Sequence, residues 1–253
     1  MTDPTPIRRG DARVQDIRIA DDVEAFLVSP EAGGTGAGIL FLHWFDTEAP
    51  DGDRTQFLAE AEGLARDLGV VSILPQGRFP WAGEPTGAEA DATRIRAEVE
   101  RHRAALDVLV ARPDVDPSRI ALVGHDFGAM HGTLLAAEDP RIAAVVLIAA
   151  TPRWGDWFLP FWPIAEDRHD YLRAIAPLDP ISRVREISPR PVCFQFARGD
   201  FFIASMTGLE FQAAAGDPKE LHAYEADHGM RVPEAARDRR AFLAAHIGLD
   251  GAD

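Results

Sequence analysis

The sequence is poor in several residue types, and each shortage excludes a class of protein. Cys193 is the only cysteine among 253 residues, so no internal disulfide can form. It lies in the apolar stretch PVCFQF, which favours a small buried side chain over a reactive thiol. No run of 18 apolar residues occurs, so a membrane-spanning helix is not expected.

Positive charge is also scarce. The formal net charge is -15, and Lys219 is the only lysine. Nucleic acids and anionic membranes bind clustered cations, so we expect neither as a partner and expect a small-molecule substrate instead. Residues 1–15 contain arginines without an apolar segment behind them, which predicts no signal peptide and a cytoplasmic location. The sequence leaves a homodimer open.

Strand-like and helix-like patterns alternate along most of the chain. Continuous apolar runs of strand length alternate with longer amphipathic segments, and this is typical of an α/β fold with a mostly parallel, doubly wound sheet and helices on both faces. We predict one domain over residues 1–253 that opens with a hairpin. Strands are expected at residues 14–19, 23–29, 38–45, 70–74, 120–124, 142–149, 192–197 and 220–226, and helices at 56–68, 91–111, 127–138, 205–214 and 233–246.

An aromatic segment at residues 151–189 interrupts this alternation between two expected core strands. Insertions at this point commonly cover the ligand site of α/β enzymes, because ligands bind beyond the carboxyl ends of the strands. We therefore predict a small cap insertion within the domain.

The most informative motif is Gly124-His125-Asp126-Phe127-Gly128, which directly follows a buried-strand pattern. Glycines at this spacing are typical of a nucleophile elbow, a sharp turn from strand to helix that presents its central residue as a reactive group. Serine usually occupies the centre, whereas here Asp126 does. An aspartate with a reference pKa of about 3.9 is already ionised at neutral pH and needs no base to activate it.

An aspartate nucleophile favours a particular electrophile. Its attack on an ester carbonyl would give a high-energy anhydride, whereas its attack on a saturated carbon gives an ordinary alkyl ester. The residue type therefore predicts attack on a carbon–halogen bond or an epoxide, followed by hydrolysis of an enzyme-bound ester.

An acid and a histidine follow in the expected order, each after a later strand pattern. Asp200 lies in the turn Arg198-Gly199-Asp200, and His228 lies in Ala226-Asp227-His228-Gly229. We predict that His228 is the general base toward water and that Asp200 fixes the imidazole tautomer. Asp227 is the rival acid, but adjacent residues rarely face one another across a turn.

With these motifs the chain resembles the α/β-hydrolase superfamily from the first hairpin to the last helix. The segments DPSRIALVGHDFGAMHG, ISPRPVCFQFARGDFFI and ELHAYEADHGMRVPEAARDRRAFL are similar to the dienelactone-hydrolase branch, whose members have serine or cysteine at position 126. The motif Gly-His-Asp-Phe-Gly-Ala instead resembles epoxide hydrolases and dehalogenases. The resemblance implies an oxyanion hole formed by the backbone N–H groups of Phe127 and Phe45, with Trp44 in place of the usual glycine.

The remaining site predictions concern the pocket. Indole N–H groups can hold a departing halide, so Trp44, Trp81, Trp154 and Trp157 are candidates, and Tyr171 is the candidate acid for opening an epoxide. His43, His125 and His131 lack metal-ligand spacing, so packing or supporting roles are expected for them. We predict no metal and no cofactor.

Two other functions stay open at this point. In the first, the chain is an esterase or lactonase of the dienelactone-hydrolase kind with an atypical residue 126, and Asp126 acts on water. In the second, it is a catalytically silent binding domain. The main prediction remains a hydrolase that forms an aspartyl ester with a largely apolar substrate.

Overall fold

The computed structural model describes residues 11–19, 23–31, 33–45, 52–78, 86–161 and 167–249. In these residues an eight-stranded sheet has the order β1-β2-β4-β3-β5-β6-β7-β8. The strands are β1 (Ala12–Ile19), β2 (Val23–Pro30), β3 (Gly38–Leu42), β4 (Val71–Pro75), β5 (Ile120–His125), β6 (Ala144–Ile148), β7 (Val192–Ala197) and β8 (Lys219–Tyr224). The predicted opening hairpin is present as β1 and β2, and its turn at residues 20–22 lies outside the described residues.

The sheet is mostly parallel, as the sequence predicts. The β2 strand pairs antiparallel with β1 and with β4, and each of the other pairs is parallel. All residues of β3, β4, β5, β6 and β7 are buried. Helices cover both faces of these strands, which explains why their sequences are continuous apolar runs rather than alternating ones.

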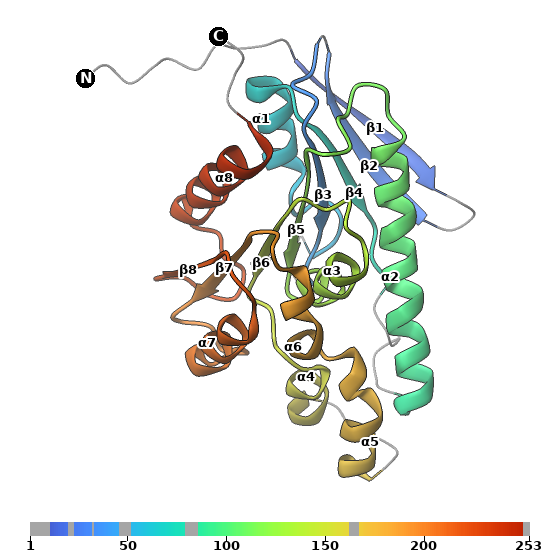
Figure 1. The fold of residues 1–253 in the computed structure, drawn as a ribbon, viewed down its shortest axis with the longest axis vertical. Coiled ribbons are helices and arrows are strands. Elements are labelled where there is room, and N and C mark those ends of the chain that lie inside the picture. The colour runs from blue at the N-terminus through green and yellow to red at the C-terminus, as the bar shows by residue number, and fades with distance from the viewer. Residues whose placement is uncertain are drawn as a thin grey trace.

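The helices form a layer on each side of the sheet (Figure 1). On one face lie α1 (Leu58–Leu68) and α8 (Pro233–Ile247), which an ion pair between Glu60 and Arg239 joins. On the other face α2 (Ala88–Val110) packs against α3 (Phe127–Glu138), and α7 (Ser205–Ala214) packs against β7. The carboxyl ends of β3, β5, β7 and β8 meet at one edge, where the predicted catalytic residues follow them.

The predicted cap segment connects β6 to β7 and is helical. It contains α4 (Trp154–Phe161), α5 (Arg168–Ile175) and α6 (Pro180–Arg183), together with the 3-10 turns Ala176–Leu178 and Val184–Ile187. The α5 helix packs beside α2, and α6 packs beside α3. Figure 1 shows α4, α5 and α6 along the side of the molecule where α3 lies.

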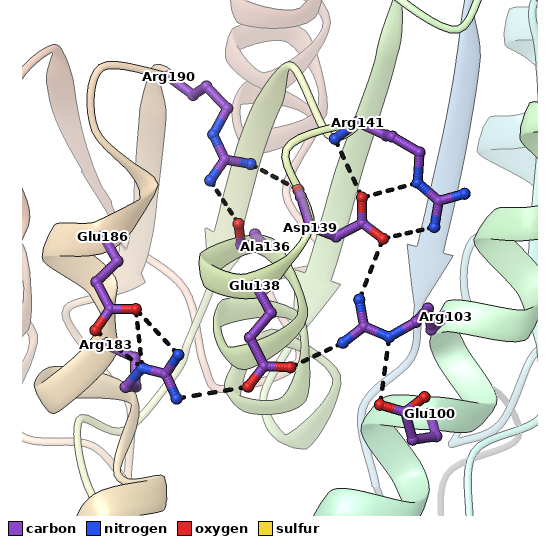
Figure 2. A network of polar contacts seen from close by, with 9 residues as sticks. All are labelled: Glu100, Arg103, Ala136, Glu138, Asp139, Arg141, Arg183, Glu186 and Arg190. Atoms are coloured by element: carbon purple, nitrogen blue, oxygen red, sulfur yellow. Dashed lines mark hydrogen bonds and ion pairs between the residues drawn. The ribbon is translucent and has the colours of Figure 1, made fainter.

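Ion pairs hold the C-terminal end of α3 (Figure 2). The Asp139 carboxylate accepts hydrogen bonds from Arg141 at 2.6 and 2.8 Å and from Arg103 at 3.2 Å. The Arg190 guanidinium donates to the backbone carbonyls of Ala136 and Asp139, at 2.6 and 2.9 Å, and so occupies acceptors that a helix end leaves without partners. These contacts fix the helix whose first residue follows Asp126.

Candidate active site

Asp126 occupies the sharp turn that its motif predicts. It lies between β5 and α3 with φ 52° and ψ -119°, a left-handed conformation that non-glycine residues seldom adopt. A Cβ atom on Gly124 would lie 2.6 Å from the Cα of Ala129, and one on Gly128 would overlap the carbonyl oxygens of Leu42 and His43. The flanking glycines are therefore required by close backbone approach, and the strained turn holds the Asp126 side chain at the edge of the sheet.

The Asp126 carboxylate lies at a helix N-terminus and accepts a backbone N–H from the loop after β3. The side chain is fully buried at the N-terminus of α3, where the helix dipole favours negative charge. Phe127 is the first residue of this helix, so its N–H belongs to the group that lacks an acceptor within the helix. The backbone N–H of Phe45 donates to Oδ2 of Asp126 at 3.5 Å. Of the two predicted oxyanion donors, Phe45 thus contacts this carboxylate, and Phe127 is the residue that follows Asp126 at the start of α3.

Phe45 lies in a loop and not in the strand that the sequence predicts at residues 38–45. The β3 strand ends at Leu42 rather than at residue 45. His43 bends the chain here, because its Nδ1–H donates to the carbonyl of Trp44 at 2.6 Å and its Nε2 accepts from the N–H of Gly77 at 2.8 Å. The bend allows the next backbone N–H, that of Phe45, to face Asp126.

His228 lies between the two predicted carboxylates. Its Nδ1–H donates to Oδ2 of Asp200 at 2.9 Å, and its Nε2 lies 3.9 Å from Oδ2 of Asp126. All three side chains are almost completely buried. The structure therefore brings together Asp126, Asp200 and His228 from the ends of three different strands.

Two nearby carboxylates keep the His228 ring charged. Burial lowers the pKa of this histidine, but the charges of Asp126 and Asp200, together with the hydrogen bond to Asp200, outweigh burial and raise the pKa to about 10. At neutral pH the resting site therefore holds an imidazolium next to the Asp126 carboxylate. In this state His228 is a proton donor and not yet the base that the sequence predicts.

Asp200 organises the loop after β7 as well as the imidazole. Its Oδ1 accepts the backbone N–H groups of Phe202 at 2.8 Å and Ile203 at 3.0 Å, while its Oδ2 faces His228. The rival acid Asp227 instead accepts the N–H of Gly229 at 3.1 Å. The geometry thus favours Asp200 over Asp227 as the partner of the imidazole.

A hydrogen-bonded chain that the sequence did not reveal connects the loops of the site. The N–H of Trp44 donates to Oε1 of Gln56 at 2.9 Å, and the amide of Gln56 donates to Nδ1 of His125. The Nε2–H of His125 then donates to the carbonyl of His228 at 2.8 Å. Gln56 and His125 thereby hold the Phe45 loop and the His228 loop at a fixed separation, whereas the sequence predicts a supporting role only for His125.

Burial keeps His125, the imidazole in this series of hydrogen bonds, neutral. It lowers the pKa of His125 well below the usual range, and the charge of His228 lowers it further. The indole of Trp44 stacks on the His125 ring with centroids 5.3 Å apart. Trp44, which stands where the α/β-hydrolase pattern has glycine, therefore covers a neutral imidazole that must donate from Nε2 and accept at Nδ1.

Comparison with known proteins now identifies the family. The sequence model of the dienelactone hydrolase family matches residues 84–246, a span that includes Asp126, Asp200 and His228. The chain belongs to the dienelactone hydrolase family. No protein of curated function matches the sequence.

Solved structures show the same fold at low sequence identity. The protein TT1662 from Thermus thermophilus aligns with a TM-score of 0.73 and 20% identity, over 94% of this chain and 98% of that one. The esterase domain of a Rhodothermus marinus protein gives 0.65 and 18%, over 94% and 98%. An acetyl xylan esterase from Paenibacillus sp. R4 gives 0.65 and 15%, over 93% and 88%.

Membership of the dienelactone hydrolase family makes this chain an enzyme of the α/β-hydrolase type, with an esterase-like fold. None of these findings supports the carbon–halogen or epoxide chemistry that the residue type at position 126 predicts. None of the described helices combines the length and apolar character that a membrane crossing requires.

Two of the predicted pocket residues reach this family member's site. The ring of Trp157 lies 5.8 Å from the His228 ring and that of Trp44 also lies 5.8 Å from it, each measured between centroids. Trp157 further stacks on Phe127 at 5.3 Å. These aromatic side chains therefore pack around the imidazole. Trp81, a third predicted pocket residue, lies outside the described residues.

Trp154 and Tyr171 use their polar atoms within the protein, although the Trp154 ring also stacks on that of Phe127 with centroids 6.1 Å apart. Both side chains are fully buried. The indole N–H of Trp154 donates to the carbonyl of Leu178 at 2.8 Å, and the hydroxyl of Tyr171 donates to Oδ2 of Asp91 at 2.9 Å. Because these polar atoms donate within the cap segment and to α2, neither the indole N–H of Trp154 nor the hydroxyl of Tyr171 is directed at a leaving group in this structure.

One group of metal-binding side chains lies elsewhere among the described residues. Cys193, Glu220 and His222 have ligand atoms within 4.8 Å of one another on β7 and β8. Burial, together with the charge of Glu220, raises the pKa of the Cys193 thiol far above its usual range. Because Glu220 is exposed and exposed acidic groups commonly occur without a metal, we assign no metal to this group.

Proposed function

We propose that this hydrolase cleaves a neutral carboxylic ester or lactone at the Asp126 site. The observation that carries the proposal is the family match, whose span contains the buried group of Asp126, His228 and Asp200. Attack of Asp126 on the ester would give an anhydride, so water is the nucleophile and Asp126 is its base.

The resting charges suit this reaction. Asp126 takes a proton from a water molecule, whose oxygen forms the new bond to the carbonyl carbon. As the carbon–oxygen bond to the leaving group breaks, the imidazolium of His228 gives its Nε2 proton to the leaving alkoxide. Proton transfer from Asp126 to His228 across the 3.9 Å gap then restores the starting state. The products are the acid and the alcohol.

The N-terminus of α3 supplies stabilisation for the carbonyl oxygen of the substrate. The N–H of Phe127 begins this helix, and donors at a helix N-terminus favour a developing negative charge. Asp200 holds the imidazolium in place throughout, because its hydrogen bond to Nδ1 is not needed for proton transfer at Nε2.

Turnover of p-nitrophenyl esters tests this proposal. We expect Asp126→Asn to lower kcat by about 10²- to 10⁴-fold, the usual contribution of a general base. Asp126→Ser should retain or raise turnover, because it creates a serine beside a histidine and an acid. Asp227→Asn is the matched control, since this carboxylate faces Gly229 rather than the imidazole. Equal activity of Asp126→Asn and the wild-type enzyme would contradict the proposal.

One observation favours a second function, the predicted aspartyl-ester chemistry on a saturated carbon. The N–H of Phe45 is directed at Oδ2 of Asp126 itself, the group that carries the oxyanion when water hydrolyses an aspartyl ester. Formation of that ester would remove one of the two charges that raise the pKa of His228, and the imidazole could then act as a base. Tyr171 donates to Asp91, so an epoxide would lack the predicted tyrosine acid and a halide is the better leaving group.

Mass spectrometry separates this function from the first. A His228→Gln variant treated with a bromoalkane should accumulate an alkyl adduct on Asp126 if the second function holds. Release of bromide without an adduct, or no release of bromide at all, argues against it. Lack of reaction with both esters and bromoalkanes would contradict both functions and favour a silent binding domain.

A further inference from the structure

Exposed apolar side chains are concentrated in one segment of the described chain. The large hydrophobic residues that reach solvent are Val14 on β1 and four residues between positions 201 and 209. Phe201 is 84% exposed and Met206 is 74% exposed. Scattered apolar residues are common on protein surfaces, whereas a contiguous group usually marks a binding surface. We call this group the 201–209 surface, and its residues are Phe201, Phe202, Met206 and Leu209.

The backbone that carries the 201–209 surface is fixed by hydrogen bonds to Asp200 and by packing of α7 on the sheet. Asp200 accepts the backbone N–H groups of Phe202 and Ile203, and the Ile203 side chain is buried. The inner side of α7 packs on the sheet through Phe211, whose ring lies 5.4 Å from that of Phe194. A Cβ on Gly208 would lie 2.9 Å from the ring of Phe196, so the helix sits closely on the strand. The exposed apolar side chains are thus attached to a backbone that these contacts fix in place.

This surface is continuous with the catalytic site. The ring of Phe202 lies 5.2 Å from that of His228 and 5.2 Å from that of Trp157. Phe201 contacts Phe202 edge to face at 5.3 Å. Met206 and Leu209 lie three residues apart and so share one side of α7. Apolar contacts therefore lead outward from the imidazole through Phe202 to Phe201, and α7, which carries Met206 and Leu209, begins three residues after Phe202.

Charge near the surface favours a neutral occupant. Glu210 is the only charged residue of α7, and two hydrogen bonds pair it with Arg153. Asp200 is in turn paired with His228. Glu210 and Arg153 therefore already pair with each other. The exposed area that this segment presents to a ligand is mainly apolar.

We infer that the 201–209 surface binds an apolar arm of the substrate, so that the enzyme acts on compounds with a medium-length alkyl or aryl arm rather than on small polar lactones. This inference rests on the proposed function for the reacting group but concerns a different part of the substrate. Burial of one methylene group changes binding by up to about 4-fold. Lengthening the arm should therefore raise kcat/KM stepwise until the surface is covered.

The test compares p-nitrophenyl acetate with p-nitrophenyl octanoate in a Phe201→Ser, Met206→Ser double variant. We expect kcat/KM for the octanoate to fall by about 10-fold or more, while that for the acetate changes less than about 2-fold. Val14→Ser is the matched control, because it removes an exposed apolar side chain from β1. Equal ratios of octanoate to acetate in the wild type and the double variant would overturn the inference.

A binding measurement keeps this result separate from the proposed function. p-Nitrophenyl octyl ether cannot be hydrolysed and quenches tryptophan fluorescence, so its affinity can be compared with that of p-nitrophenyl ethyl ether. Weaker binding of the octyl ether to the double variant supports the surface even if no ester is cleaved, in which case the proposed function alone fails. If the variant instead changes only the sedimentation of the protein, the surface contacts a second copy and the inference is wrong.

Discussion

Oδ2 of Asp126 accepts a backbone hydrogen bond from Phe45 at 3.5 Å, so the loop after β3 is directed at the side chain that follows β5. In a serine hydrolase the corresponding N–H would face the substrate's carbonyl oxygen. Here the donor and the neighbouring imidazolium both stabilise a carboxylate. In the resting site His228 is therefore the protonated group, and the Asp126 carboxylate lies beside it.

Removing the charge of Asp126 should lower the pKa of His228. Asp126→Asn removes one of the two carboxylates that raise the histidine's pKa to about 10, so the pKa should fall by at least about one unit. Titration of the imidazole nitrogens by NMR checks this, with Asp227→Asn as the control. An unchanged pKa would show that the two side chains do not interact.

The pH dependence of ester hydrolysis should follow the protonated histidine. Because the pKa of His228 is raised to about 10, the imidazolium persists through neutral pH and is lost only as the pH approaches that value. We expect kcat/KM to stay level from about pH 6 to 9 and to decline above about pH 10. A rise with an inflection near pH 6.5 would instead indicate that a neutral histidine starts the reaction.

Gln56 should act as a positioning residue. Gln56→Leu removes the acceptor for Trp44 and the donor for His125, which frees the two loops that carry Phe45 and His228. We expect kcat to fall about 10-fold with little change in KM, and the melting temperature to drop by the equivalent of about 1 kcal/mol. Half-buried Gln15 on β1, which lies outside the site, offers a control through Gln15→Leu. A loss confined to stability, with kcat intact, would limit Gln56 to a packing role.

Asp179 in the cap segment should make stability depend on pH. Burial raises its pKa to about 7, helped by the charge of Asp156, while the carboxylate accepts the N–H of Trp154 at 2.9 Å. Between about pH 4 and 7 the folded protein then holds a proton that the unfolded chain has released, so stability falls as pH rises through this window.

Asp179→Asn removes that charge and keeps an acceptor. It should raise the free energy of unfolding at pH 8 by an amount on the order of 1 to 3 kcal/mol and have little effect near pH 4. Asp170→Asn, at an exposed position of α5, is the control for thermal denaturation at both pH values. Equal effects at pH 4 and pH 8 would show that the Asp179 carboxyl does not titrate in this range.

The sequence predicts the parts of the fold that depend on local pattern. Buried runs such as that of β5 identify the parallel strands, and the spacing of Gly124 and Gly128 identifies the turn that holds Asp126. Asp200 and His228 are found because each directly follows a strand. In each case one short segment contains both the structural signal and the functional residue.

Other features depend on contacts between distant segments. The hydrogen bond from Gln56 to His125 spans 69 residues and leaves no pattern in either segment. Aromatic residues in the cap have the same appearance in sequence whether their rings contact the catalytic histidine, like that of Trp157, or are fully buried beside the cap helices, like that of Trp154. The exposure of Phe201 likewise depends on the fold of the turn after β7, which Asp200 holds through the N–H groups of Phe202 and Ile203.

One single-turnover reaction in water enriched in oxygen-18 tests the central claim most directly. If Asp126 acts as a base on water, an ester substrate should yield acid that contains oxygen-18, and the peptide that carries Asp126 should stay unlabelled. Oxygen-18 in the Asp126 carboxylate after that first turnover would contradict the account and show that this side chain bonds to the substrate.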